Sequence, residues 1–224
     1  MNPNQRVYAQ PAGAILETNK VLRSTYMLLS ITLLFSAAMA GVSVALQMGP
    51  MTNLVSFIGA LALIWLVLPK TANSAAGIAV VFAITGLMGF GLGPVLSSYL
   101  AVPNGGQLVG TALGGTGVIF LALSGYALVT KKDFSFLGGM LMVGFLVVIV
   151  AAVANIFLAI PALSLAISSV VILIMSGFIL FDTSRIINGG ETNYIMATVS
   201  LYLSIYNIFI SLLHLLGMFG GNDD

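Results

Sequence analysis

The chain has 224 residues, of which 59% are hydrophobic and only 6% are charged, and its formal net charge is +1. Soluble domains usually carry about 25% charged residues, so this composition excludes an ordinary soluble protein and is typical of a polytopic α-helical membrane protein. The small net charge comes without a basic patch, which argues against nucleic-acid binding. Cysteine is absent and there is a single histidine, so disulfides, thiolate chemistry and a zinc site are not expected.

Seven apolar spans are expected to cross a lipid bilayer, because most of them have about the 20 residues that a bilayer core requires. In chain order they are Thr25–Leu46, Leu54–Leu68, Ala76–Leu100, Leu108–Val129, Phe136–Leu158, Leu163–Ile187 and Tyr194–Leu216. The second span is short, and Met51–Asn53 is its natural extension. The third span holds four glycines and Pro94 within nine residues, which predicts a kink or break.

The spans divide the chain into three regions. Residues 1–24 are expected to be a flexible N-terminal tail, because they contain Pro3, Pro11 and several Asn and Gln residues, with one Gly. Residues 25–216 form the seven-helix transmembrane domain, and residues 217–224 form a short C-terminal tail. An alternative is signal-peptide cleavage after the sequence Ala38-Met39-Ala40, but the apolar character continues to Leu46.

The basic residues predict the topology. All seven lie on one side of the membrane if the spans alternate in direction: Arg6, Lys20, Arg23, Lys70, Lys131, Lys132 and Arg185. The gaps on the other side contain no Lys or Arg. Because cytoplasmic loops carry the excess of basic residues, the N-terminus is expected in the cytoplasm and the C-terminus outside.

The last span carries a polar stripe that is expected to lie on one helix face. Its members recur at spacings of 4, 3, 4 and 3: Ser200, Ser204, Asn207, Ser211 and His214. Polar groups are costly in lipid, so this face is expected to meet protein or water. For His214 a hydrogen bond to a neighbour is favoured over a proton-sensitive switch.

Asp182 is the only acidic residue inside a predicted span. An ionisable residue at this depth is a functional-site hypothesis by default. Arg185 follows three residues later, so a structural ion pair with Arg185 or with Lys70 is an equally open alternative.

Small and amide residues indicate contacts between helices. Gly89 with Gly93, and Gly110 with Gly114, have the four-residue spacing that lets helix backbones approach closely. Asn155 is expected to form an interhelical hydrogen bond.

The sequence offers no catalytic centre. The zinc motif His-Glu-x-x-His, a Gly-x-Ser-Gly serine site and a second intramembrane aspartate are all missing, and the last span has no lysine for a retinal Schiff base. We therefore expect no enzyme activity and assign no catalytic, cofactor-binding or metal-ligating residue.

Several stretches resemble the Bax inhibitor-1 family. Its C-terminal signature is matched by Phe181–Ile186, Gly189–Ile195 and Leu201–Phe209. Leu22–Tyr26 opens the first span and Lys132–Gly139 opens the fifth in the same way, so the resemblance covers the chain nearly end to end. Within the family, the sequence is most similar to the branch of bacterial inner-membrane modulators of the FtsH protease.

The resemblance implies a fold in which six helices surround a central seventh, in a bacterial inner membrane, with a periplasmic C-terminus. It implies a non-enzymatic regulator that binds FtsH, a membrane-anchored, ATP-dependent protease that draws in its substrates from an exposed end. The HflK/HflC complex is a further implied partner. The tail residues Asn2, Arg6 and Lys20 are candidates for engagement by the protease, and the protein itself would be a slowly degraded substrate.

The alternative function is a pH-sensitive cation leak, for calcium or protons. The resemblance implies that leak members pair an aspartate in the sixth span with one in the seventh. Asp182 matches the first aspartate, but Ser204 occupies the second position, so the carboxylate pair is missing and calcium is disfavoured. The candidate polar core or gate comprises Asp182, Arg185, Ser204, Asn207 and Lys70. A structural or chaperone-like membrane factor is a third class.

Overall fold

The computed structural model describes residues 12–220, and this part of the chain contains helices and no strand. The helices are α1 (Ala12–Ala45), α2 (Met51–Ala62), the π-helical turn η1 (Leu63–Val67), α3 (Leu68–Thr71), α4 (Ala76–Leu100), α5 (Gly105–Thr130), α6 (Leu137–Leu158), α7 (Pro161–Ile187) and α8 (Tyr194–Gly220). Seven segments are long and apolar enough to cross a membrane, with α2, η1 and α3 forming one of them. The predicted all-helical fold with seven spans is confirmed.

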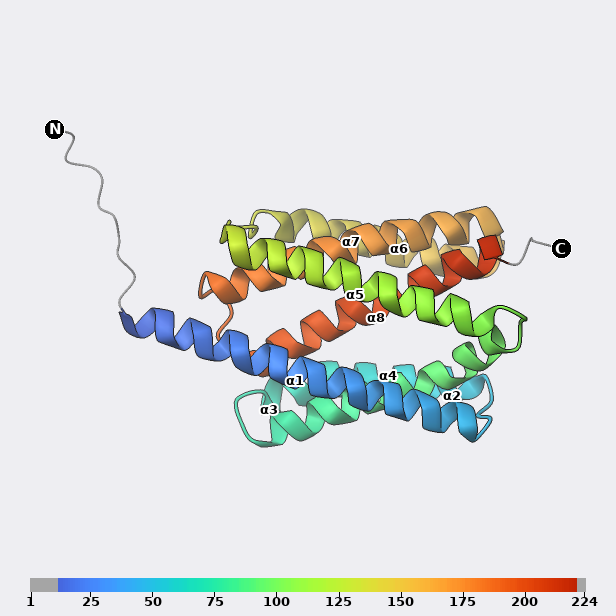
Figure 1. Cartoon of the computed structure of the whole chain (residues 1–224), viewed down its shortest axis with the longest axis horizontal. Helices are drawn as coiled ribbons and strands as arrows, with labels where there is room; N and C mark the ends of the chain where they lie inside the picture. The colour runs from blue at the N-terminus through green and yellow to red at the C-terminus, as the bar shows by residue number, and fades with distance from the viewer. Residues whose placement is uncertain (1–11, 221–224) are drawn as a thin grey trace.

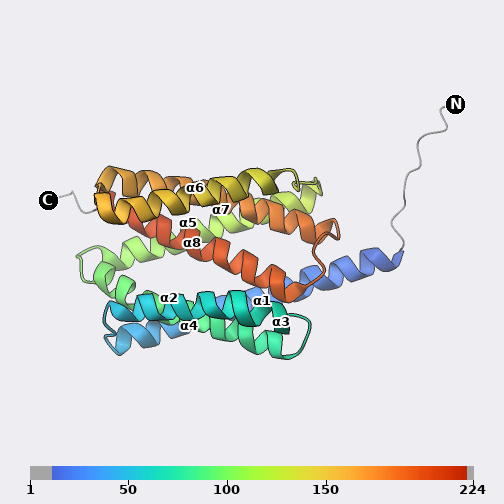
Figure 2. The ribbon, with the colours of Figure 1, turned by 180° about the vertical axis from the view of Figure 1, so that it is seen from behind.

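The other helices form two groups, and α8 runs between the groups (Figures 1 and 2). In one group α1 and α2 both pack on α4, and in the other α5 and α6 both pack on α7. Helix α8 contacts α1, α4, α5 and α7 directly, whereas α2 and α6 pack on α4 and α7 instead. The last helix is therefore the central one, as predicted.

The connections that carry basic residues gather at one end of the bundle, on the left in Figure 1. This end holds the start of α1, the short helix α3 with Lys70, the α5–α6 connection and the α7–α8 connection. We call it the basic end. These connections lie at the same end because successive helices run in opposite directions.

The beginning of α1 differs from the prediction. The helix starts at Ala12, so residues 12–24, predicted as part of a flexible tail, form its first turns. This segment contains Ala, Leu, Glu, Lys and Arg, which favour helix even where the sequence is too polar to read as a span. Asn2 and Arg6 lie outside the described residues. Helix α8 likewise extends to Gly220, beyond the predicted domain end at residue 216.

Two prolines lie within spans and have different local outcomes. Helix α4 is assigned without interruption from Ala76 to Leu100 through Pro94, so the predicted break does not occur. The second span begins at Met51, as its predicted extension requires, and contains η1, which ends two residues before Pro69. A proline has no N–H to donate and its ring conflicts with the carbonyl four residues earlier, so a wider turn is a suitable local solution.

Helices α1 and α4 approach each other closely at two glycines, and we call this contact the glycine seam. A Cβ atom at Gly89 would lie 2.2 Å from the Ser36 carbonyl oxygen, and one at Gly93 would lie 2.0 Å from Ser43 Oγ. Only glycine fits at such distances, and the predicted close approach is confirmed for this pair.

The second predicted glycine pair has a different environment. A Cβ atom at Gly110 or Gly114 would meet no atom within 4 Å. The expectation of close packing there is wrong, because both glycines lie on an exposed face of α5. Four-residue glycine spacing permits a close approach but does not specify a neighbour.

A buried tyrosine joins α8 to the glycine seam. Tyr202 is 1% exposed, its hydroxyl lies 2.7 Å from Ser36 Oγ, and it donates to the Thr85 carbonyl at 3.3 Å. Ser36 also faces Gly89, so one small region connects α1, α4 and α8. In the other group, Asn155 donates to Ser164 Oγ at 2.6 Å, which confirms the predicted bond between α6 and α7.

The glycine seam yields a matched stability test. We expect Gly89→Ala to lower the free energy of unfolding by about 1–3 kcal/mol, because the added methyl must displace backbone. Gly110→Ala is the control and should leave stability unchanged or raise it by up to about 1 kcal/mol. Both values are measurable by titrating sodium dodecyl sulfate into dodecylmaltoside micelles. Equal effects of the two substitutions would contradict the seam.

Candidate functional site

The connection between α7 and α8 lies at the basic end and has a defined structure. Gly189 adopts a positive φ of 74°, and the Gly190 N–H donates to the Arg185 carbonyl at 2.8 Å. With the Gly189 N–H bonded to the Ile186 carbonyl, this is a Schellman motif, which ends α7. Asn193 Oδ1 accepts from the N–H groups of Ile195 and Met196, so Asn193 caps the start of α8.

Asp182 lies one and a half turns before the end of α7 and is 8% exposed. Its Oδ2 atom accepts a hydrogen bond of 2.5 Å from Ser200 Oγ, the first residue of the polar stripe. The bond joins α7 to α8 inside the bundle. Because a buried carboxylate is costly unless it is paired or hydrogen-bonded, Ser200 is the main observed support for Asp182.

Arg185 does not pair with Asp182. Its Nη2 atom lies 3.5 Å from Glu191 Oε2 and donates to the Gly190 carbonyl at 3.1 Å, and its guanidinium carbon lies 5.4 Å from the centroid of the Phe181 ring. The long side chain reaches out toward the wetter connection, where it keeps its charge solvated. Lys70 is exposed on α3, and the described residues contain no ion pair between Lys70 and Asp182. The alternative of an ion pair between Asp182 and either residue is therefore not seen among the described residues.

The other predicted gate residues satisfy their polar groups within α8. Ser204 is 3% exposed and donates to the Ser200 carbonyl at 3.2 Å, and Asn207 donates to the Leu203 carbonyl at 2.8 Å. Both bonds are to the backbone four residues earlier, and among the described residues neither side chain is hydrogen-bonded to Asp182. Ser204 and Asn207 belong to the stripe itself. Of the other three candidates, only Asp182 is hydrogen-bonded to the stripe among the described residues, through Ser200.

The polar stripe faces α7 along much of its length. Toward the other end of the bundle, His214 Nδ1 lies 2.9 Å from Ser168 Oγ on α7. This confirms the expectation that His214 hydrogen-bonds to a neighbour. The pairs Asp182–Ser200 and Ser168–His214 are separated by 14 residues on both helices, or about 21 Å at 1.5 Å per residue, so they share one antiparallel register.

A second polar cluster lies beside Asp182 and was not singled out from the sequence. The Tyr26 hydroxyl of α1 hydrogen-bonds to Ser124 Oγ of α5, and both hydroxyls lie 3.5 Å from Thr183 Oγ1 of α7. The residues come from three spans and have no common spacing, although Tyr26 and Thr183 belong to the matched family motifs. The only feature of the sequence that could have pointed to these three residues is that each places a hydroxyl group within an apolar span.

Ser184 ties α7 to the α5–α6 connection. Its Oγ donates to the Lys132 carbonyl at 3.1 Å and accepts from the Phe134 N–H at 2.9 Å. In the same connection, hydrogen bonds from the Ser135 side chain and backbone lower the pKa of Asp133. Four consecutive residues, Asp182 to Arg185, thus contact four different parts of the basic end.

The arrangement has limited chemical capacity. Asp182 can hold or exchange a proton, but its observed partner is a hydroxyl and not a second carboxylate. Within residues 12–220, no group of three or more His, Asp or Glu side chains is placed to hold a metal ion. The site is a buried polar junction between helices.

These observations define the class of protein: a seven-span membrane bundle built around a polar central helix, with a dense hydrogen-bonded junction at its basic end. The family model named Bax1-I, described as inhibitor of apoptosis-promoting Bax1, matches residues 18–221. The chain belongs to this family.

Curated relatives match nearly the whole chain. A protein of Escherichia coli K12 named modulator of FtsH protease YccA is 55% identical over 204 residues, which cover 91% of this chain and 92% of the relative. The equivalent protein of E. coli O6:H1, with the same identity and coverage, is named an inner membrane protein. An uncharacterized membrane protein of Vibrio cholerae is 52% identical over 208 residues, 93% of each chain.

The Asp182–Ser200 bond can be tested by removing the hydroxyl. We expect Ser200→Ala to lower the free energy of unfolding by about 1–3 kcal/mol, because it leaves a buried carboxylate without its donor. Ser169→Ala is the control: Ser169 is exposed on the same α7 and bonds only to its own helix, so its loss should cost less than about 0.5 kcal/mol. Equal costs in the detergent titration described above would show that the bond does not stabilise the fold.

Proposed function

We propose that this chain is a non-enzymatic inner-membrane modulator of the FtsH protease, with its N-terminus in the cytoplasm and its C-terminus in the periplasm. The observation that carries the proposal is the 55% identity, over 91% of the chain, to the E. coli protein named for that role. The basic residues at one end of the bundle support the orientation, because cytoplasmic connections are enriched in Lys and Arg. The HflK/HflC complex is part of the proposal as a further partner.

The packing of α1 suggests how such a modulator would act. A protease that pulls on the N-terminus must separate α1 from α4, α7 and α8, on which it packs, and must break the Tyr26–Ser124 hydrogen bond to α5. The glycine seam and the Ser36–Tyr202 bond oppose this separation. A substrate that is drawn in slowly occupies the protease and slows the degradation of other membrane proteins.

The proposal predicts a requirement for the residues before α1. Deleting residues 2–11, which include Asn2 and Arg6, should abolish FtsH-dependent degradation of this protein, while Lys20 and Arg23 still favour the cytoplasmic orientation. The same deletion should remove the slowing of other FtsH substrates on overproduction. Pulse–chase measurements of both half-lives test this, alongside co-purification with FtsH.

A matched control replaces residues 2–11 with a Gly/Ser segment of equal length that keeps Arg6. This variant should be degraded at a rate close to the unaltered chain if a flexible handle is sufficient. Unchanged degradation after the full deletion would count against engagement through the tail. Failure to co-purify with FtsH, together with no effect on its substrates, would reject the modulator function.

A proton or cation leak is the second candidate, and the buried Asp182 is the observation that favours it. It predicts ion flux in liposomes that depends on this carboxylate, with Asp182→Asn reducing the flux at least tenfold. Ser169→Ala, on the exposed face of the same helix, should leave the flux unchanged. Absence of flux between pH 5 and pH 8, in liposomes that retain the folded protein, would reject this function.

A further inference from the structure

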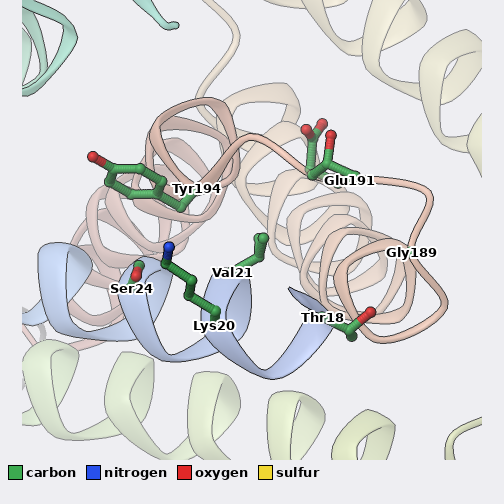
Figure 3. Close-up of a pocket in the computed structure, with 8 residues that line it drawn as sticks. Thr18, Lys20, Val21, Ser24, Gly189, Glu191 and Tyr194 are labelled. Carbon is green, nitrogen blue, oxygen red and sulfur yellow. The ribbon is translucent and has the colours of Figure 1, made fainter. Parts of the chain in front are cut away.

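A cavity of about 380 Å³ lies at the basic end, between the start of α1 and the α7–α8 connection (Figure 3). Helix α1 contributes Thr18, Lys20 and Ser24, and the other wall includes Glu191, Thr192 and Tyr194. The size falls within the range of about 300–1,000 Å³ that is usual for small-ligand sites. Asp182 and Ser200 do not line this cavity. Lys20, named above as a candidate for protease engagement, does line it.

The charges around the cavity favour an anion. Glu191 is engaged within the connection: its Oε2 faces Arg185 and its Oε1 accepts the Asn193 N–H at 2.9 Å. Its negative charge is thus balanced by Arg185. Figure 3 shows the Lys20 amine extending from α1 toward the space beside Tyr194. Lys20 therefore adds a positive charge, and hydroxyl groups supply further hydrogen-bond donors.

The position of the cavity indicates where the anion comes from. The first candidate span begins at Thr18, so the cavity lies where the apolar span meets the aqueous side. Lipid headgroups occupy this level of a bilayer. Basic pockets between transmembrane helices are suited to phospholipid headgroups, and a lysine ammonium is a common phosphate ligand.

We propose that this cavity binds the phosphate group of a glycerophospholipid headgroup. Lys20 forms the charged contact, and Ser24 of α1 and Thr192 of the connection donate hydrogen bonds. The bound lipid joins the first turns of α1 to the α7–α8 connection. This joins two segments that are far apart in the sequence, at the end where α1 enters the bundle.

The test uses the full chain in detergent micelles, titrated with dioleoylphosphatidylglycerol and followed by native mass spectrometry. We expect one saturable lipid site. Lys20→Gln should weaken its affinity about tenfold, the loss typical of a charged hydrogen bond. Ser24→Ala should weaken it about fivefold. Lys131→Gln is the matched control, because Lys131 is exposed at the same end but does not line the cavity. This variant should bind the lipid with the same affinity as the unaltered chain.

Two further probes identify the source of the phosphate. Dioleoylglycerol has the same acyl chains without phosphate and should not occupy the site. Displacement of the lipid by millimolar inorganic phosphate would support phosphate recognition but make a soluble anion the natural ligand. Equal lipid binding by the Lys20→Gln, Lys131→Gln and unaltered chains would overturn the proposal, as would equal binding of dioleoylglycerol. The assay contains no protease, so its outcome is independent of the FtsH proposal.

Discussion

A polar group within a membrane is costly unless it finds a partner inside the protein, and this constraint governs the position of α8. The helix carries serine, asparagine and histidine along one face. Lipid cannot satisfy these groups, whereas neighbouring helices and the helix backbone can. In the bundle, Ser200 bonds to Asp182, and His214 bonds to Ser168. Helices α1, α4, α5 and α7 therefore enclose α8. Helices α2 and α6, which lack such a stripe, pack on the outer side of α4 and α7 and do not contact α8.

The two sides of α8 are held by different kinds of contact. Toward α7 the contacts are hydrogen bonds in one antiparallel register. Toward α1 and α4 they depend on small residues: Gly89 allows Ser36 to come close, and Ser36 then reaches the Tyr202 hydroxyl. Both regions are buried, so an unmade hydrogen bond or a cavity there would be costly. The bundle is thus a connected structure in which α1 cannot leave without disturbing α4 and α8.

This connectivity accords better with a protein that resists extraction than with an open conduit. Ser204 and Asn207, which would line a polar path along α8, bond to their own backbone. The Asp182 carboxylate accepts a hydrogen bond from the Ser200 hydroxyl and does not pair with a second carboxylate. The basic end holds the hydrogen bonds that tie α7 to the neighbouring connections, and also the cavity beside Lys20. The contacts that hold α1 most closely, at Ser36 and Ser43, lie further along the helix.

The sequence by itself determined the number of spans, their boundaries to within a few residues for most helices, the central position of the last helix and the family. Composition and hydropathy suffice for the spans because lipid imposes one rule on every span. The family and the central position of the last helix rest instead on the resemblance of the sequence motifs to the Bax inhibitor-1 family. Only the tertiary structure decided which partner each polar group takes. Arg185 and Asp182 are adjacent on α7, yet Arg185 turns to Glu191 and Asp182 to Ser200. Gly89 and Gly110 have identical spacing to their glycine partners, yet only Gly89 meets another helix. The partner of each residue depends on which side chains the neighbouring helix places at the same depth in the bundle. The spacing of residues along one helix does not contain that information.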